Sequence, residues 1–289
     1  MKKTTLILSI LITSFLSSCS TEDNKNEPIN SNHLVKREYV SNNVNLEYRY
    51  NENGHLTRIL DIDIQEEIDS EINFTYDSNN VVSRNIVSNN SNYHSTTNYS
   101  YNGNSRLENV VSTIDSGYKT TNITQEFSYN NNIITINISS NSEQSSIITL
   151  EVNSSGLVTK ITKAEYYTVI NYDSNGNISE IKLYNNDDTL MNTTEYAYDN
   201  KPNPFYGKLK SIYLPIFLHA FRDDFFSEFV WDGYEGYYFP FLRNNITSIM
   251  ENGNLDRNYN YLYHNQNYPI NVIEEFNGNN TYEFDIEYE

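Results

Sequence analysis

Six carboxylates lie within eleven residues in the first third of the chain: Asp61, Asp63, Glu66, Glu67, Asp69 and Glu71. Several oxygen ligands in so short a stretch could bind a hard cation such as Ca²⁺. However, Leu60, Ile62 and Ile64 alternate with polar residues, which is the pattern of a strand with one solvated face. The stretch also has no glycine where a Ca²⁺-binding turn would need one. We therefore expect a strand here and no metal site.

Catalytic motifs are absent from the sequence. The histidines His33, His55, His94, His219 and His264 are scattered, and no two of them have the spacing of metal ligands on a helix. Nothing resembles HExxH, GxSxG or a phosphate-binding loop. A pair of carboxylates that hydrolyses glycosidic bonds meets only in the folded protein, so a carbohydrate-active enzyme stays an alternative. We assign no catalytic residue, expect no cofactor, and do not expect an enzyme.

Residues 205–241 are rich in aromatic side chains that could bind a ligand. Trp231, Tyr234, Tyr237 and Tyr238 could stack on sugar rings, because each combines a flat apolar face with a polar tip. The competing interpretation, which we favour, is that these aromatic residues fill a core. Leu214, Phe217, Leu218 and Phe221 have the spacing of one helical face, and Pro215 would lie in the first turn. We predict a short helix followed by an aromatic loop.

The elements that must position these residues are copies of one β-hairpin. The clearest copy is residues 165–184, EYYTVINYDSNGNISEIKLY. Its first strand places Tyr166, Thr168, Ile170 and Tyr172 on one face. Residues 173–177 supply the turn, since Asp and Asn bond their own backbone and glycine accepts a positive φ.

Further copies recur along most of the chain. They are anchored at Tyr50, Tyr76, Tyr101, Tyr129, Val152, Tyr172, Tyr198 and Tyr263. The first seven anchors are 20–28 residues apart, which is the length of one hairpin with its turns. The chain closes with one more strand, residues 282–289, in which apolar and acidic residues alternate. Six to eight hairpins predict roughly 12–16 strands, and a closed barrel of that size is too wide for its side chains to fill. We therefore predict that residues 205–241 lie inside it as a plug.

The N-terminus carries an export signal. Two lysines precede an apolar run, and Leu16-Ser17-Ser18-Cys19 follows; Cys19 is the single cysteine of the chain. This arrangement resembles the lipobox of bacterial lipoproteins, which implies that residues 1–18 are a cleaved signal peptide and that Cys19 is lipidated. No thiol then remains for a disulfide or a metal. Residues 19–32 are polar and predict a flexible tether, in which Glu22 and Asp23 resemble a surface-export signal.

The charge balance limits the partners. The precursor has a formal net charge of −19, and loss of Lys2 and Lys3 gives −19 − 2 = −21. Such acidity argues against binding to nucleic acid and against electrostatic adsorption to anionic lipid.

Two sequence patterns support a resemblance to known families. The pattern apolar-x-Tyr-Asp-x-x-Gly-Asn-Ile, best kept over residues 170–178, resembles the YD repeat of RHS-type proteins. With residues 198–205 and 244–247 as further landmarks, residues 45–289 resemble bacterial surface lipoproteins of unknown function, a family described as having a porin-like fold. The resemblance implies a fold and brings no catalytic residues.

We therefore predict that residues 33–289 form a single all-β domain. It would be an antiparallel meander of repeated hairpins in a large curved or barrel-like sheet, interrupted by the insertion 205–241. The predicted function is a non-catalytic, lipid-anchored protein on the outer membrane surface. Its partners would be the bilayer through Cys19 and a glycan or a protein. A membrane-spanning β-barrel pore stays a further alternative, which an outward apolar band about 25 Å tall would favour.

Overall fold

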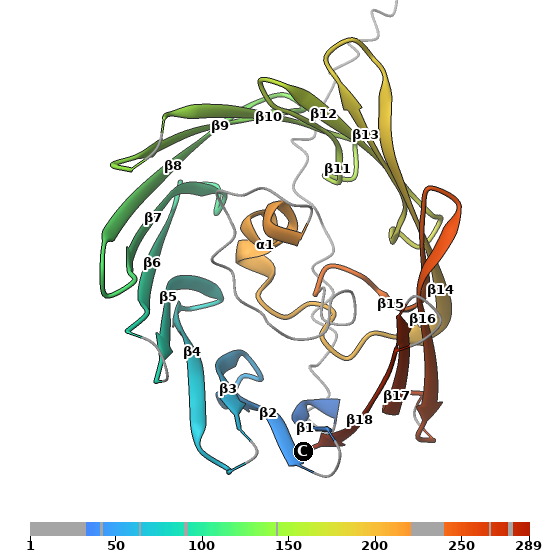
Figure 1. The fold of residues 1–289 in the computed structure, drawn as a ribbon. Helices are drawn as coiled ribbons and strands as arrows, with labels where there is room; N and C mark the ends of the chain where they lie inside the picture. The colour runs from blue at the N-terminus through green and yellow to red at the C-terminus, as the bar shows by residue number, and fades with distance from the viewer. Residues whose placement is uncertain are drawn as a thin grey trace, which may run out of the picture.

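The computed structural model describes residues 33–40, 43–63, 65–89, 92–142, 144–220, 240–265, 267–276 and 280–289. Within these ranges the chain forms one sheet of eighteen β-strands (Figure 1). The strands are β1 Val35–Val40, β2 Asn43–Tyr50, β3 Leu56–Ile62, β4 Ile68–Asp77, β5 Asn80–Ser88, β6 His94–Tyr101, β7 Leu107–Asp115, β8 Thr120–Asn130, β9 Ile133–Ser140, β10 Ser146–Val152, β11 Val158–Thr162, β12 Tyr166–Tyr172, β13 Ile178–Asn185, β14 Leu190–Pro202, β15 Asn244–Glu251, β16 Asn254–Tyr263, β17 Pro269–Phe276 and β18 Asn280–Tyr288.

The sheet is an antiparallel meander that closes on itself. Every strand pairs with its neighbours in sequence, and β18 pairs with β1, with Val40 opposite Phe284. The predicted all-β meander of hairpins is therefore confirmed, and the sheet is a closed barrel. The expected 12–16 strands were too few. β17 and β18, which end at Tyr288, form a ninth copy of the hairpin unit. The alternation of apolar and acidic residues in β18 had hidden Tyr288 as the ninth anchor.

The predicted turns also form. The Asp173 side chain accepts hydrogen bonds from the backbone N–H groups of Asn175 (2.8 Å) and Asn177 (2.9 Å). Gly176 has a φ of +85°, which a residue with a Cβ adopts only at a cost. Asn51, Asn102 and Asn153 make the same pair of bonds in the turns of earlier copies. All these turns follow even-numbered strands and therefore lie at one end of the barrel.

A row of tyrosines connects the copies, and we call it the tyrosine ladder. Each hydroxyl donates a hydrogen bond of 2.6–2.7 Å to a backbone carbonyl oxygen at the beginning of the preceding odd-numbered strand. The pairs are Tyr76 with Leu56, Tyr101 with Val81, Tyr129 with Leu107, Tyr172 with Val158, Tyr198 with Ile178, Tyr261 with Ile246, and Tyr288 with Pro269.

The segment between β14 and β15 enters the barrel. Its described part contains a 3₁₀ turn, Lys210–Ile212, and the helix α1, Tyr213–Ala220, which lies inside the ring of strands (Figure 1). The predicted helix is thus confirmed, with Pro215 in its first turn. We call the end at which this segment enters, where the even-to-odd turns lie, the plug end.

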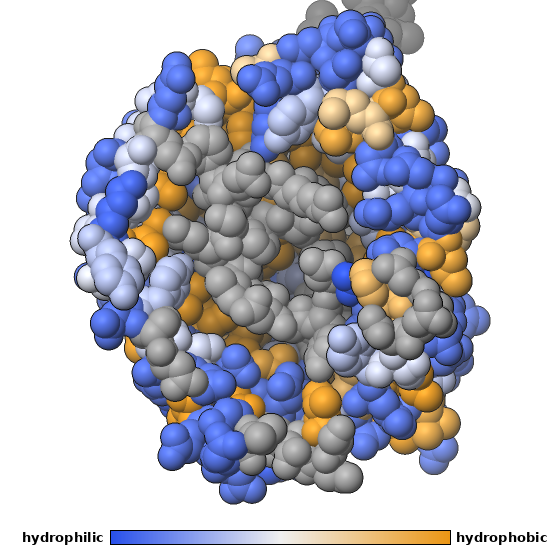
Figure 2. All heavy atoms as spheres, in the orientation of Figure 1, coloured by the Kyte–Doolittle hydropathy of each residue, from blue (hydrophilic) through white to orange (hydrophobic). Residues whose placement is uncertain are grey.

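The core of the molecule is the inner wall of the barrel. Tyr48 on β2 packs against Phe205 of the insertion, with ring centroids 5.1 Å apart, and both are buried. Residues two apart along each strand share this inner face, so the aliphatic residues of all the strands form one cluster with the insertion. Figure 2, which looks along the barrel, shows hydrophobic residues inside the ring of strands and mostly hydrophilic residues around its rim.

Charged residues occupy the outer wall in pairs. Lys36 on β1 lies 2.9 Å from Glu287 on β18, Arg37 lies 3.1 Å from Glu47 on β2, and Arg58 on β3 pairs with Glu71 on β4. In the described ranges, no helix has the length and apolar composition that crossing a membrane requires.

The acidic run forms a turn as well as strand ends, so the expected continuous strand is wrong in part. β3 ends at Ile62 and β4 begins at Ile68. Between them, the Asp63 carboxylate accepts the backbone N–H groups of Gln65 (2.8 Å) and Glu67 (2.9 Å). Asp63 therefore closes the hairpin, a role that alternation alone does not reveal.

Candidate functional site

The base of the insertion is a polar site in which several side chains share hydrogen bonds. It combines Asn177 from the β12–β13 turn, Asp199 from β14, Asn244 and Asn245 from β15, and Tyr263 from β16. We call these five residues the clamp. They come from four separate parts of the chain that meet at the plug end.

Asp199 is the centre of the clamp. Its carboxylate accepts the backbone N–H groups of Lys201 (2.9 Å) and Asn245 (3.2 Å), and also the Asn245 side-chain amide (3.1 Å). The hydroxyl of Tyr263 donates to the same carboxylate. Burial, reinforced by this hydrogen bond, raises the pKa of Tyr263. With four donors already around it, the carboxylate has little capacity left to bind a ligand or a metal ion.

Asn177 connects the neighbouring hairpin to the strand that returns from the insertion. Its side chain is fully buried. Its Oδ1 accepts the backbone N–H of Arg243 (2.7 Å), and its Nδ2 donates to Asn244 Oδ1 (2.9 Å). The two ends of the insertion, at β14 and β15, are therefore held together by hydrogen bonds of these side chains with each other and with backbone N–H groups.

The described part of the insertion is packed into the lumen. Phe205, Leu209, Ile212, Ile216, Phe217 and Leu218 are all at most 7% exposed. Ser211 Oγ accepts the backbone N–H of Val81 on β5 (2.9 Å), and Lys208 Nζ donates to the Gly54 carbonyl oxygen (3.2 Å). Burial lowers the pKa of the Lys208 ammonium to about 8. The predicted plug is thus present in residues 205–220, whereas Phe226 and Trp231 lie outside the described residues.

Two carboxylates are fully buried in the described wall, and their separation bears on the glycosidase alternative. Glu38 on β1 accepts the Tyr48 hydroxyl (3.1 Å), and burial raises the pKa of its carboxyl well above the usual range. Glu274 on β17 lies 2.7 Å from the Arg257 guanidinium.

The strand register places Glu38 two strands away from Glu274 and four residues along. That places their Cα atoms about 16 Å apart. Glycosidase carboxyl pairs are about 5–10 Å apart, whereas Glu38 and Glu274 are bonded to separate partners in the wall, Tyr48 and Arg257.

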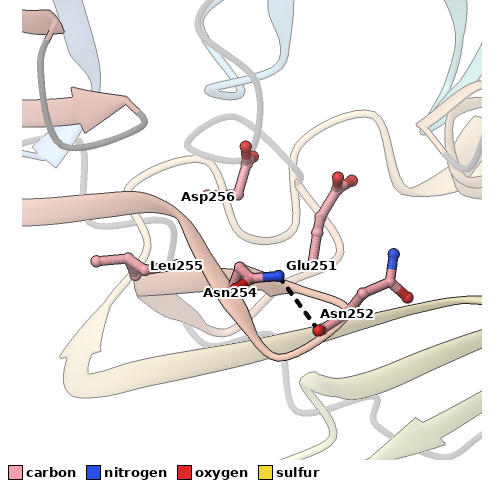
Figure 3. Close-up of a pocket in the computed structure, with 5 residues that line it drawn as sticks. All are labelled: Glu251, Asn252, Asn254, Leu255 and Asp256. Atoms are coloured by element: carbon pink, nitrogen blue, oxygen red, sulfur yellow. Dashed lines mark hydrogen bonds between the residues drawn. The ribbon is translucent and has the colours of Figure 1, made fainter.

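One pocket of about 280 Å³ lies at the β15–β16 hairpin, lined by Glu251, Asn252, Asn254, Leu255 and Asp256 (Figure 3). Asn254 donates to the Asn252 carbonyl oxygen (3.4 Å) across the turn, and Arg257 lies 3.5 Å from Asp256. The pocket is a shallow depression at a hairpin tip. Within the described residues, no group of three or more His, Cys, Asp or Glu side chains could hold a metal ion.

Most of the residues predicted from the sequence as sites lie outside the described ranges. These are the lipidation site Cys19 and the stacking candidates Trp231, Tyr234, Tyr237 and Tyr238. The clamp was not predicted, although Asp199, Asn244 and Asn245 fall within the two segments noted as landmarks. Their shared position next to the insertion was the available signal.

The fold and the clamp together define the class of protein: a closed antiparallel β-barrel with an apolar inner wall and an insertion held inside it. No protein-family model matches the chain, and no curated protein matches it. The resemblance to surface lipoproteins and to YD repeats therefore stays an interpretation of the sequence.

Among solved structures, the chain is similar to a porin-like protein from Bacteroides vulgatus, with a TM-score of 0.42 and 14% identity over 89% of this chain and 98% of that one. It is also similar to a porin-like protein from Bacteroides uniformis, with a TM-score of 0.34 and 15% identity over 71% of this chain and 93% of that one.

Proposed function

We propose that this protein is a non-catalytic, lipid-anchored binding or structural protein of the outer membrane surface, whose barrel stands in water beside the bilayer. The observation that carries the proposal is the polarity of the wall. The buried aliphatic and aromatic cluster faces the lumen, and the outward side chains are mostly charged or hydrogen-bonding, with Val111, Ile147 and Leu262 as exposed exceptions. A barrel in a bilayer requires the opposite arrangement, with apolar side chains facing the lipid.

The charged residues of the outer wall indicate the size of this effect. Glu47 and Arg49 on β2 form an ion pair of 2.8 Å, and Glu71 on β4 pairs with Arg58. An outward arginine or lysine at the middle of a bilayer costs about 2–4 kcal/mol. Several such residues on neighbouring strands disfavour the membrane-spanning pore, whereas in water they cost almost nothing.

The two buried acids support a non-catalytic role. The carboxyl of Glu38 is bonded to Tyr48, and that of Glu274 is bonded to Arg257 and to Tyr259 (3.3 Å). Because Glu38 is 0% and Glu274 is 1% exposed, a substrate in solution does not reach either carboxyl.

The position of the tether suggests how the barrel stands on the membrane. His33 stacks on Tyr268 of the β16–β17 turn, with ring centroids 4.6 Å apart, so the chain enters the barrel at the plug end. Thirteen residues lie between Cys19 and His33, and the fourteen Cα-to-Cα steps reach at most about 50 Å. A lipid on Cys19 would therefore attach the barrel at its plug end, within about 50 Å of the membrane.

The proposal is tested by replacing residues 1–19 with a cleavable leader that directs no lipidation. The exported chain is expected in the soluble fraction, folded and without detergent, whereas the natural chain stays with the membrane. A chain that remains in the membrane fraction after alkaline extraction and dissolves only in detergent would contradict the proposal and favour the pore.

A further inference from the structure

Part of the outer wall of the barrel contains rows of side chains without any charge. Ion pairs connect β18 with β1, β1 with β2, and β3 with β4, as described above. On the outer face of β5 to β9, two rows of cross-strand neighbours contain no Asp, Glu, Lys or Arg. We call these two rows the neutral face. Asp115 on β7 and Glu126 on β8, both exposed, border the neutral face on its two sides.

The first row crosses four strands. Asn85 on β5 is opposite Thr96 on β6, Thr96 is opposite Thr113 on β7, and Thr113 is opposite Asn122 on β8. Thr96 donates to Asn85 Oδ1 (2.6 Å), and Thr113 donates to Asn122 Oδ1 (3.0 Å). The order Asn-Thr-Thr-Asn is therefore fixed by two hydrogen bonds, and the row spans about 14 Å.

The second row lies beside the first, two residues along each strand. It consists of Ser83, Asn98, Val111, Thr124 and Ser139, each opposite the next. Asn98, Val111 and Ser139 are exposed, and Val111 is 41% exposed. Tyr118 in the β7–β8 turn, at the end of these strands, is 98% exposed.

The two hydrogen bonds of the first row determine which of its donors and acceptors remain available to a ligand. Because each asparagine Oδ1 accepts a threonine proton, the amide Nδ2 groups of Asn85 and Asn122 remain donors. The hydroxyl oxygens of Thr96 and Thr113 remain acceptors. Since these side chains are already ordered by their mutual bonds, less rotamer freedom is lost when a partner binds.

We propose that the neutral face is a docking surface for a neutral, hydroxyl-rich polysaccharide. Sugar hydroxyls both donate and accept hydrogen bonds, so they match a surface of amides and hydroxyls without the cost of desolvating a charge. The proposal rests on the function proposed above, because a barrel that stands in water exposes this wall to the cell surroundings.

The composition of the neutral face favours a glycan over a protein partner. Protein interfaces depend on buried Trp, Tyr and Arg anchors, and neither row contains any of these residues. Tyr118 at the end of the strands supplies one exposed aromatic ring on which a sugar can stack.

Affinity electrophoresis of the full-length lipidated protein in non-ionic micelles tests this proposal. The probes are the neutral polysaccharides dextran, mannan, xylan and laminarin, with alginate as a charged comparison. We expect at least one neutral probe to retard the wild-type protein and alginate not to. Thr113→Glu should weaken the retardation about tenfold or more, because it places a charge in the centre of the first row.

Thr193→Glu is the matched control. Thr193 is opposite Lys182 on the outer wall of β14, far from the neutral face, so the same substitution there should leave retardation unchanged. Asn122→Ala, which adds no charge, should also weaken binding. The proposal is overturned if no neutral probe binds, if alginate binds equally well, or if both Thr→Glu variants behave alike. Because the protein is in micelles, this result does not depend on whether the barrel inserts into a membrane or is displayed at the cell surface. The leader replacement described above tests those two points separately.

Discussion

The hydroxyl of Tyr172, at the end of β12, donates a 2.7 Å hydrogen bond to the carbonyl oxygen of Val158, at the beginning of β11. Val158 is opposite Val152 at a β-bulge, where the register shifts by one residue. A bulge disrupts the hydrogen bonds between strands, and the tyrosine satisfies a carbonyl oxygen at that point.

The same relationship holds along the whole tyrosine ladder. In all seven pairs, the carbonyl oxygen belongs to a residue that lies opposite the anchor of the preceding hairpin copy, which is a tyrosine or Val152. The strand register shifts at each of these positions. The β8–β9 pair has no register shift, and the copy that would serve it ends in Val152, which has no hydroxyl. Register shifts at β18–β1, β1–β2, β3–β4, β13–β14 and β15–β16 have no ladder tyrosine, so the association of bulge and tyrosine is limited to the seven pairs above.

Removing one ladder hydroxyl should leave a buried carbonyl oxygen without its partner. Tyr172→Phe keeps the ring and its burial, so we expect a loss of about 1–3 kcal/mol in the free energy of unfolding. Denaturant titration followed by circular dichroism measures this loss. Tyr118→Phe, at an exposed turn, is the control and should change stability by less than about 0.5 kcal/mol. Equal stability of both variants and the wild type would show that the ladder has no energetic role.

Two glycines in equivalent turns should respond differently to alanine. Gly176 has a φ of +85°, whereas Gly103, in the turn after β6, is not in the left-handed region and has no atom within 4 Å of the position that a Cβ would occupy. We expect Gly176→Ala to lower the thermal midpoint, with a cost of about 1 kcal/mol. Gly103→Ala should leave it unchanged or raise it slightly. Calorimetry of both variants checks the difference, and the reverse order would contradict the assigned turn geometry.

The insertion should contribute strongly to stability through Phe205. This side chain is fully buried against Tyr48, so Phe205→Ala should cost about 3–5 kcal/mol. The neighbouring Tyr206 is 44% exposed, and Tyr206→Ala should cost less than about 1 kcal/mol. Denaturant midpoints of the two variants measure the contrast. Similar midpoints would mean that the insertion is not part of the core.

Alkaline pH should unfold the barrel through its tyrosines. Burial raises the pKa of Tyr101 and of Tyr129 to about 12 and raises that of Tyr172 as well. An unfolded tyrosine has a pKa of about 10. The folded state therefore holds more protons above pH 10, and the stabilisation present below pH 10 is lost as the pH rises towards 12.

Ultraviolet absorbance of tyrosinate, recorded together with circular dichroism, follows this loss. Ladder tyrosines should ionise only as the secondary structure disappears. Ionisation of all tyrosines near pH 10, with the fold intact, would contradict their burial.

The hairpin copies could be predicted from the sequence because tyrosine, turn residues and period coincide in most of them. The ninth copy, β17 and β18, was missed because the outward residues of β18 are acidic and because the given sequence contains only Glu289 after Tyr288. The clamp could not be predicted, because Asn177 and Arg243 are 66 residues apart and meet only when β13 and β15 flank β14. Closure of the barrel likewise depends on β1 meeting β18, a pairing that no local pattern specifies.

The central claim is that apolar side chains face the lumen and polar side chains face outward, and cysteine labelling tests it most directly. The chain without Cys19 contains no thiol, so single cysteines can be placed at neighbouring positions of β7. Thr113 faces outward and is exposed, whereas Ser112 faces the lumen and is 9% exposed. We predict that a water-soluble maleimide labels Thr113→Cys rapidly and Ser112→Cys only after unfolding. Rapid labelling of Ser112→Cys, with Thr113→Cys reached only by a lipid-soluble reagent, would contradict the account and establish a membrane-embedded barrel with a wet lumen.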